Sequence, residues 1–420
     1  MGDVLLDVQA ETLPQSLSPM KSNPLRTITR PVRTGADRLL DAASGLIEGK
    51  RIGLLTNHTG RLSNGNSTIE AIARAGICRL TALFGPEHGI AGNTPDGIAI
   101  AGGVETRLGA PVFSLYGDVQ KPTPDMLKEV DVLVCDIQDV GARFYTYIST
   151  IALAMEAAAE SGIPVVILDR PNPIRGLSFE GPVCQPSLKS LVGWMPIPIT
   201  TGLTLGELCK VCNDEGWLDG GRKANLHVVL MERWRRSMWY DETGLAWIPP
   251  SPNMPTLATA AIYPGMCLVE GTSLSEGRGT SDPFLIAGAP WADPECVLGQ
   301  LSRFDVRGVK VTPERFTPRD IPGTARQPKF EGRECRGIRI EIVNRDALKP
   351  VHVGISVLAA FKRAHPEDML FDSMRFDLLA GNLQVREDLE LGAPPDEICA
   401  AWESGLADFS RIRSGYLMYE

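Results

Sequence analysis

Apolar runs alternate with segments of helical spacing through the first half of the chain, from about residue 36 onward. Apolar positions at helical spacing mark candidate helices at residues 67–76, 144–162 and 205–216, with a short one from residue 125. Alternating strands and helices predict crossover connections and a parallel sheet, and strands that are apolar throughout predict cover on both faces. The apolar runs that predict the strands occupy residues 51–56, 79–85, 111–117, 132–135, 163–173 and 226–231.

The pattern changes after about residue 240. Residues 246–284 are rich in Pro, Gly, Ser and Thr, which predicts loops, and the chain ends in an amphipathic helical pattern over 397–419. Between them lie strand candidates at 309–316 and 337–344 and a helix from about 350. We therefore predict an α/β protein with a Rossmann-like parallel sheet in its N-terminal domain and a smaller α+β C-terminal domain. The predicted divisions are a poorly ordered extension (1–35), a catalytic domain (36–245) and a closing domain (246–420).

Composition excludes several classes of protein. The 420 residues are 43% hydrophobic and 22% charged, as in folded globular proteins, and the net charge of −9 argues against a nucleic-acid-binding surface. No run of apolar residues is long enough for a membrane-spanning helix, so we expect no membrane partner. The first residues show no secretion signal, which predicts a cytoplasmic protein; a misassigned start would leave periplasmic or secreted locations open.

The nine cysteines are scattered, and the only close pair is Cys209 and Cys212. No second pair and no nearby histidine completes a zinc site, so we expect buried structural thiols, no metal and no cofactor.

Polar motifs follow the ends of five predicted strands. They are TNHTG with Asn57 and His58, GPEHG with Glu87 and His88, GD at 117–118, DIQDVGAR from Asp136, and DRPNP with Asn172. Ligands of open parallel sheets bind outside the carboxyl ends of the strands. The five motifs together therefore predict a functional crevice at this edge, whereas helix capping would explain one or two of them.

Two Gly and a Pro fix the backbone around Glu87, and its apolar neighbours Phe84 and Ile90 suit a general acid. The alternative is an ordinary surface carboxylate. Asp136, Gln138 and Asp139 are suited to binding sugar hydroxyls, and Asp136 is equally well interpreted as a structural cap.

Arg143 either pairs with Asp139 or binds a substrate carboxylate. Asn172 either lines the crevice or serves only the structure of its turn, and the two interpretations are equally good.

The segment EGTSLSEGRGT (270–280) places Glu270, Glu276 and Arg278 close together among flexible glycines. It lacks the spacing and the lysine of a phosphate-binding loop, and no GxGxxG follows the first strand. Sugar recognition across a domain cleft is the functional interpretation, and a solvated hinge loop is the alternative.

These motifs carry a family resemblance. GLLTNHTGR, LFGPEHGIAG, SLYG, DIQDVGARFYTYI, LDRPNPI, EGP, PPSPNMP and EGTSLSEGRGT occur in this order, and with them the chain resembles the exo-acting β-N-acetylmuramidases of the NamZ type from about residue 36 to its end. The resemblance implies an active site between a Rossmann-like domain and a smaller domain. It also implies release of N-acetylmuramic acid from the non-reducing end of peptidoglycan fragments.

Carried to this chain, the resemblance makes Glu87 the candidate acid, with His88 and Asp136 as further catalytic candidates. The second catalytic group stays open between Asp136, Asp139, Glu270 and Glu276, or the substrate's own 2-acetamido group. The lactyl carboxylate needs a cation, for which Arg143 and Arg278 are the candidates. The full set of predicted substrate-binding residues is Asn57, His58, Gln138, Asp139, Arg143, Tyr145, Asn172, Glu270, Glu276 and Arg278.

The expected partner is a muropeptide or a peptidoglycan-derived disaccharide, drawn from recycled fragments, and the oligomeric state stays open. Two other functions compete with hydrolysis. One is a muropeptide-binding protein without turnover, and the other is an α/β enzyme that uses a nucleotide or a phosphate.

Overall fold

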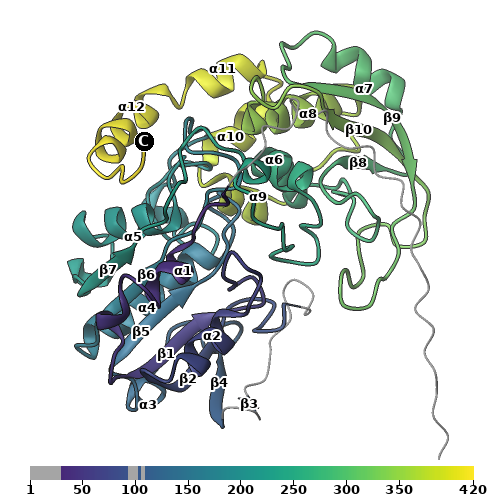
Figure 1. The fold of residues 1–420 in the computed structure, drawn as a ribbon. Coiled ribbons are helices and arrows are strands. Elements are labelled where there is room, and N and C mark those ends of the chain that lie inside the picture. Colours follow the sequence, from purple (N-terminus) through teal and green to yellow (C-terminus); the bar gives the residue numbers. More distant parts are fainter. Residues whose placement is uncertain (1–29, 93–102, 106–108) are drawn as a thin grey trace, which may run out of the picture.

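The computed structural model describes residues 30–92, 103–105 and 109–420. Most of the predicted N-terminal extension lies outside these residues. Its last part is packed on the protein, because Val32 and Thr34 are buried and Thr34 caps the first helix. Figure 1 shows a lower α/β domain and an upper domain that carries a second, smaller sheet.

The first domain is built on a seven-stranded sheet in the order β3-β4-β2-β1-β5-β6-β7. Six strands are parallel, and only the edge strand β3 runs antiparallel to its neighbour β4. The predicted parallel sheet is therefore confirmed. Its strands are β1 (Arg51–Thr56), β2 (Arg79–Gly85), β3 (Gly103–Glu105), β4 (Ala110–Ser114), β5 (Val132–Asp136), β6 (Val165–Leu168) and β7 (Leu226–Val229).

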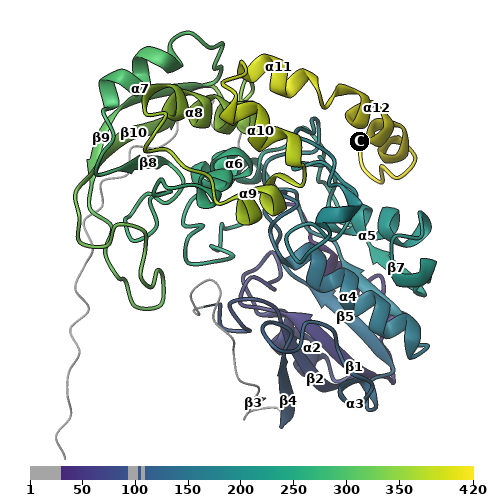
Figure 2. The same cartoon turned by 180° about the vertical axis from the view of Figure 1, so that it is seen from behind.

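Both faces of this sheet are covered, which explains why its strands are apolar throughout. Along β5, Val132 and Val134 point into one buried cluster and Leu133 and Cys135 into another. Helices α1 and α2 cover the first face, and α4 and α5 the second (Figures 1 and 2). The helices are α1 (Gly35–Leu39), α2 (Thr68–Ala75), α3 (Pro124–Leu127), α4 (Tyr147–Glu160) and α5 (Leu205–Asp214).

The second domain surrounds an antiparallel sheet in the order β8-β10-β9. This agrees with the predicted smaller domain of mixed α and β structure. Its strands are β8 (Ile286–Ala289), β9 (Val309–Phe316) and β10 (Cys335–Ile342). Its helices are α6 (Leu257–Met266), α7 (Pro294–Leu301), α8 (Pro350–Ala364), α9 (Ser373–Ala380), α10 (Leu383–Glu390), α11 (Pro395–Ala400) and α12 (Glu403–Ser414).

Helix α6 lies within the stretch 246–284 that the sequence predicts as loops. It is buried on all sides from Thr259 onward, so it has no polar face and no amphipathic period. Its Gly265 packs against the start of α8, where a Cβ atom would lie 1.8 Å from the carbonyl oxygen of Pro350. The glycine that resembles a helix breaker in the sequence thus permits a close helix–helix contact.

The C-terminal helical pattern forms two helices, α11 and α12, and the chain then returns to the first domain (Figure 1). The guanidinium of Arg413 donates to the carbonyl oxygens of Thr201 and Gly202, and the hydroxyl of Tyr419 donates to Asp169 at 2.5 Å. The last residues of the second domain therefore tie it to the parallel sheet.

Candidate functional site

A cavity of about 640 Å³ lies between the carboxyl edge of the parallel sheet and the second domain. Residues from both domains line it, including three carboxyl groups, four cationic side chains and several aromatic rings. Of the residues predicted from the sequence, six line this cavity: Glu87, His88, Tyr145, Glu270, Glu276 and Arg278. The predicted crevice therefore exists, but fewer motifs reach it than expected.

Glu87 is held on a sharp turn directly after β2. The backbone N–H of Gly89 donates to the carbonyl oxygen of Pro86 at 2.9 Å, and His88 adopts a left-handed conformation with φ 69°. This conformation is uncommon for a residue with a side chain and often marks a functional site. The hydroxyl of Thr146, at the start of α4, donates to Glu87 Oε2 at 2.8 Å. Turn and helix together fix the carboxyl group at the cavity.

The opposite wall is a network of opposite charges around two buried carboxyl groups, Glu270 and Glu276. Arg278 Nη1 lies 2.5 Å from Glu270 Oε1 and 3.3 Å from Glu276 Oε1, and Arg375 Nη2 lies 2.6 Å from Glu270 Oε2. Burial alone would raise the pKa of Glu270, but the guanidinium groups of Arg278 and Arg375 outweigh it and lower the pKa to about 2. Glu270 is thus an anion at every physiological pH.

Lys329 also lines this wall. Its ammonium nitrogen lies 2.8–3.3 Å from the carbonyl oxygens of Val269, Glu270, Thr272 and Leu274, and burial lowers its pKa. Lys329, Arg375 and Arg326 also line the cavity but were not predicted from the sequence. No motif marks them: Arg326 and Lys329 come from the connection between β9 and β10, and Arg375 comes from α9.

Asp136 does not reach the cavity, although the sequence predicts a catalytic role for it. It is fully buried, and both of its carboxylate oxygens accept from Arg170, at 2.7 and 2.9 Å. A carboxylate with both oxygens bound to one guanidinium is a structural anchor.

Arg143 also lies outside the cavity. It does not pair with Asp139, and it does not face an open space that a substrate carboxylate could enter. Its Nη atoms donate to the carbonyl oxygens of Pro182, Ile197 and Leu379, and burial lowers its pKa to about 10. Its role is to join the first domain to α9.

Asn57 and His58 hold the segment that connects the two domains. Asn57 Nδ2 donates to the hydroxyl of Tyr147, which in turn donates to the carbonyl oxygen of Pro250. His58 Nε2 lies 2.7 Å from the carbonyl oxygen of Pro249, and burial lowers the pKa of this imidazole. A neutral ring donating to a carbonyl group fits these contacts.

The loop that carries Glu87 also closes on His58. A Cβ atom at Gly92 would lie 1.8 Å from His58 Nδ1, so only glycine fits there. Asn57 and His58 therefore lie outside the cavity and support its wall.

The remaining three predicted residues make local contacts outside the cavity. Gln138 Nε2 donates to the carbonyl oxygens of Asp139 and Pro171, and Asn172 Nδ2 donates to that of Leu203. Asp139 accepts from the N–H of Gly141 at 2.7 Å, and burial raises its pKa to about 7. The turn interpretation of Asn172 thus accounts for its contacts, whereas the sugar-binding interpretation of Gln138 and Asp139 gains no support from this cavity.

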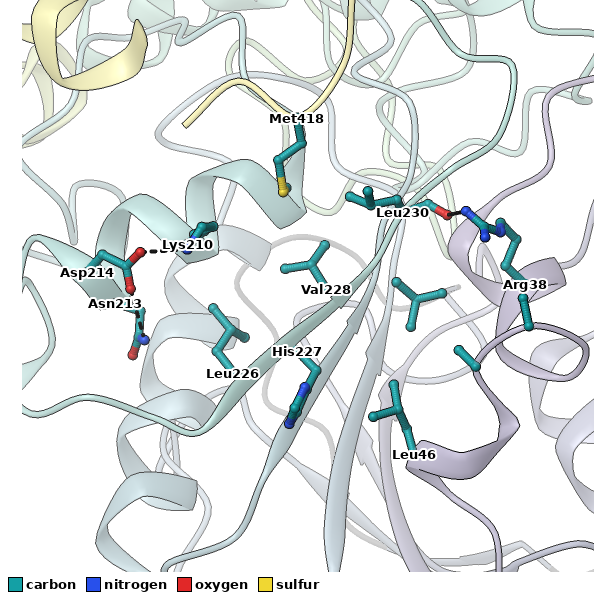
Figure 3. Close-up of a pocket in the computed structure, with 13 residues that line it drawn as sticks. Arg38, Leu46, Lys210, Asn213, Asp214, Leu226, His227, Val228, Leu230 and Met418 are labelled. Atoms are coloured by element: carbon teal, nitrogen blue, oxygen red, sulfur yellow. Dashed lines mark hydrogen bonds and ion pairs between the residues drawn. The ribbon is translucent and has the colours of Figure 1, made fainter. Parts of the chain in front are cut away.

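A different hollow, of about 500 Å³, opens at the edge strand β7 (Figure 3). Leu226, Val228 and Met418 line it, and its one carboxylate, Asp214, is paired with Lys210 at 2.7 Å. It lacks the several carboxyl groups of the interdomain cavity, which is the stronger candidate for an active site.

Cys209 and Cys212 are buried in the core, as the sequence predicts, and all nine thiols are free. Within the described part of the chain, no helix has the length and apolar character that a membrane crossing requires.

Fold and cavity together define a two-domain α/β protein whose candidate active site is shared by a Rossmann-like sheet and a second domain. Two family models match in succession: the N-terminal domain of the exo-β-N-acetylmuramidase NamZ over residues 52–258 and its C-terminal domain over residues 261–419. The chain belongs to the NamZ family, and the resemblance inferred from its motifs is confirmed.

Individual relatives agree over nearly the whole chain. The peptidoglycan β-N-acetylmuramidase NamZ of Bacillus subtilis strain 168 is 43% identical over 406 residues, which is 96% of this chain and 95% of that protein. Two crystal structures of DUF1343 family proteins from Bacteroides fragilis NCTC 9343 match with TM-scores of 0.84 and 0.75, at 36% and 32% identity. Each match covers 93% of this chain and 99% of the other.

Proposed function

We propose that this protein is an exo-β-N-acetylmuramidase, a glycosidase that releases N-acetylmuramic acid from the non-reducing end of peptidoglycan fragments. Membership of the NamZ family and the near full-length similarity to a peptidoglycan β-N-acetylmuramidase support this activity. The structural observation that carries the proposal is the placement of three carboxyl groups around one cavity, Glu87 from the first domain and Glu270 and Glu276 from the second. Glycosidases generally use two carboxyl groups on either side of the scissile bond.

Glu87 is the proposed general acid. Among the described residues it is the one carboxyl group that the first domain contributes to the cavity, and Thr146 orients it. It protonates the glycosidic oxygen while the bond from that oxygen to the anomeric carbon breaks, so that the aglycone leaves as a neutral alcohol. Water then completes hydrolysis at the anomeric carbon.

Glu276 is the proposed second carboxyl group. Both oxygens of Glu270 are bound to guanidinium groups, which commits that side chain to the network. Glu276 Oε2, in contrast, is buried without a hydrogen-bond donor among the described residues, and Lys329 Nζ forms an ion pair with it at 3.5 Å. A carboxyl oxygen that accepts no hydrogen bond is suited to the positive charge that develops at the anomeric carbon.

Turnover of a chromogenic β-N-acetylmuraminide tests the proposal. We expect hydrolysis by the wild type and a loss of about 10²-fold or more in kcat for Glu87→Gln, since general acid catalysis contributes this much. Glu48→Gln is the matched control, because Glu48 is an exposed carboxyl group outside the cavity. Wild-type kcat in Glu87→Gln would overturn the acid assignment. A wild type that binds the sugar without releasing any product would favour the binding-protein function instead.

Glu276→Ala tests the second group separately. We expect a loss of about 10²-fold or more in kcat, partly restored by azide, whose small anion fits the space left by the carboxylate. Glu270→Ala serves as the comparison, and azide is expected to restore nothing there because its loss disrupts Arg278 and Arg375. Equal azide responses in both variants would contradict the assignment of Glu276.

A further inference from the structure

The charged residues of the described chain that line the interdomain cavity do not balance. Among its described lining residues, four cationic side chains (Arg278, Arg326, Lys329 and Arg375) face three carboxyl groups (Glu87, Glu270 and Glu276). Three of the cations are committed, because Arg278 and Arg375 bind Glu270 and Lys329 is held by four carbonyl groups and Glu276. Among the described lining residues, Arg326 is therefore the cation without a carboxylate partner.

Arg326 is exposed at the cavity, and within the described part of the chain its guanidinium has no hydrogen-bond or ion-pair partner. It is carried by the connection between β9 and β10, which reaches over the cavity from the second domain. A planar guanidinium with all its donors available at a ligand cavity is suited to two-pronged binding of a carboxylate.

The loop that carries Arg326 is anchored on both sides of it. Before it, the N–H of Arg319 donates to the carbonyl oxygen of Gly279, which follows Arg278, and Asn253 Nδ2 donates to the carbonyl oxygen of Thr324 at 3.0 Å. After it, Lys329 is fixed by its carbonyl contacts. These anchors hold the backbone on both sides of Arg326 before a ligand arrives, which lowers the entropic cost of ordering the loop on binding.

We infer that Arg326 binds the lactyl carboxylate of N-acetylmuramic acid and so selects this sugar over neutral N-acetylhexosamines; the inference rests on the proposed function. The substrate carries one negative charge on its lactyl ether, and Arg326 is the one lining cation of the described residues that needs no rearrangement to accept it. This assignment replaces both candidates from the sequence. Arg143 is bound to carbonyl groups outside the cavity, and Arg278 is neutralised by Glu270 and Glu276.

Two substrates that differ in the charge of the lactyl group, and otherwise by one methyl group, test the inference: 4-nitrophenyl β-N-acetylmuraminide and its lactyl methyl ester. We expect the wild type to prefer the free acid. Arg326→Gln lowers kcat/KM for the acid roughly 10- to 100-fold, mainly through KM, because charge-assisted hydrogen bonds are lost. Turnover of the ester falls much less, because the neutral ester has no charge to pair with Arg326, and Arg326→Lys recovers part of the preference through its charge.

Arg319→Gln is the matched control, since Arg319 is an exposed arginine of the same loop that does not line the cavity. It removes the same charge and is expected to keep the preference, which separates direct contact from the general electrostatic field. A parallel loss on both substrates in Arg326→Gln would overturn the inference, as would a preference that disappears in Arg375→Gln and persists in Arg326→Gln.

Calorimetric binding of free N-acetylmuramic acid and its methyl ester gives a readout that does not depend on turnover. If the wild type hydrolyses neither substrate but binds the acid more tightly than the ester, and Arg326→Gln abolishes this difference, the proposed hydrolysis fails while the role of Arg326 stands. Equal binding of acid and ester by the wild type would overturn the role of Arg326.

Discussion

Thr146 and Glu87 are joined by a hydrogen bond of 2.8 Å that connects the start of helix α4 to the turn after β2. The two residues lie 59 positions apart in the chain, and both line the interdomain cavity. Thr146 is a positioning residue in this arrangement, because its hydroxyl orients the carboxyl group that is proposed to protonate the glycosidic oxygen.

We expect Thr146→Val to lower kcat by about 5- to 15-fold, since one hydrogen bond of about 1–1.5 kcal/mol is lost while the shape of the side chain is retained. Thr146→Ser keeps the hydroxyl and should restore kcat. A change in KM alone would show that Thr146 binds substrate and does not orient Glu87.

Much of the fold follows from local sequence signals. The strand predicted at 79–85 is β2, and that predicted at 309–316 is β9, with the same bounds. Both carry a local signal: β2 is an apolar run that is buried toward its end, and β9 alternates between more and less exposed positions. Helix α6 was not predicted, because burial on every side removes the polar face by which an amphipathic helix is recognised in a sequence.

The site was harder to predict, because polar residues after a strand serve two purposes. Glu87 and Asp136 both follow apolar strands, yet one lines the cavity and the other is fully paired with Arg170. The two residues differ in their partner: Asp136 is paired with Arg170, which follows the end of the neighbouring strand β6. Arg326 and Arg375 lie in segments without a motif, so only the folded chain brings them to Glu270 and Glu276.

Arg143 provides a test of this distinction between structural and substrate-binding cations. Replacing it by Met removes the donors to three buried carbonyl groups, and we expect the free energy of unfolding to fall by about 3 kcal/mol or more. Chemical denaturation measures this loss. At a temperature where the variant is folded, its preference for the free lactyl acid over the methyl ester should equal that of the wild type. A stable variant that has lost this preference would show that Arg143 binds the substrate.

Asp169 makes the stability of the protein depend on pH. It is fully buried, and burial raises its pKa to about 6, although donors from Tyr419, Gly206 and Thr204 act in the opposite direction. The unfolded chain releases this proton near pH 4, so between about pH 4 and 6 the folded state binds more protons than the unfolded state. The contribution of Asp169 is therefore fully present below about pH 4 and is lost as the pH rises through 6, by about 2–3 kcal/mol.

We expect Asp169→Asn to remove this dependence, because the amide does not titrate and its oxygen still accepts from the N–H groups of Arg170 and Gly206. Urea denaturation of both proteins from pH 4 to 7 measures this dependence. The unfolding free energy of the wild type minus that of Asp169→Asn should decrease as the pH rises. Tyr419→Phe is the comparison: it keeps the carboxyl group but removes one donor, so the pKa of Asp169 rises and the loss of stability moves to higher pH. Parallel pH curves for wild type and Asp169→Asn would show that Asp169 is already ionised in the folded protein at pH 4.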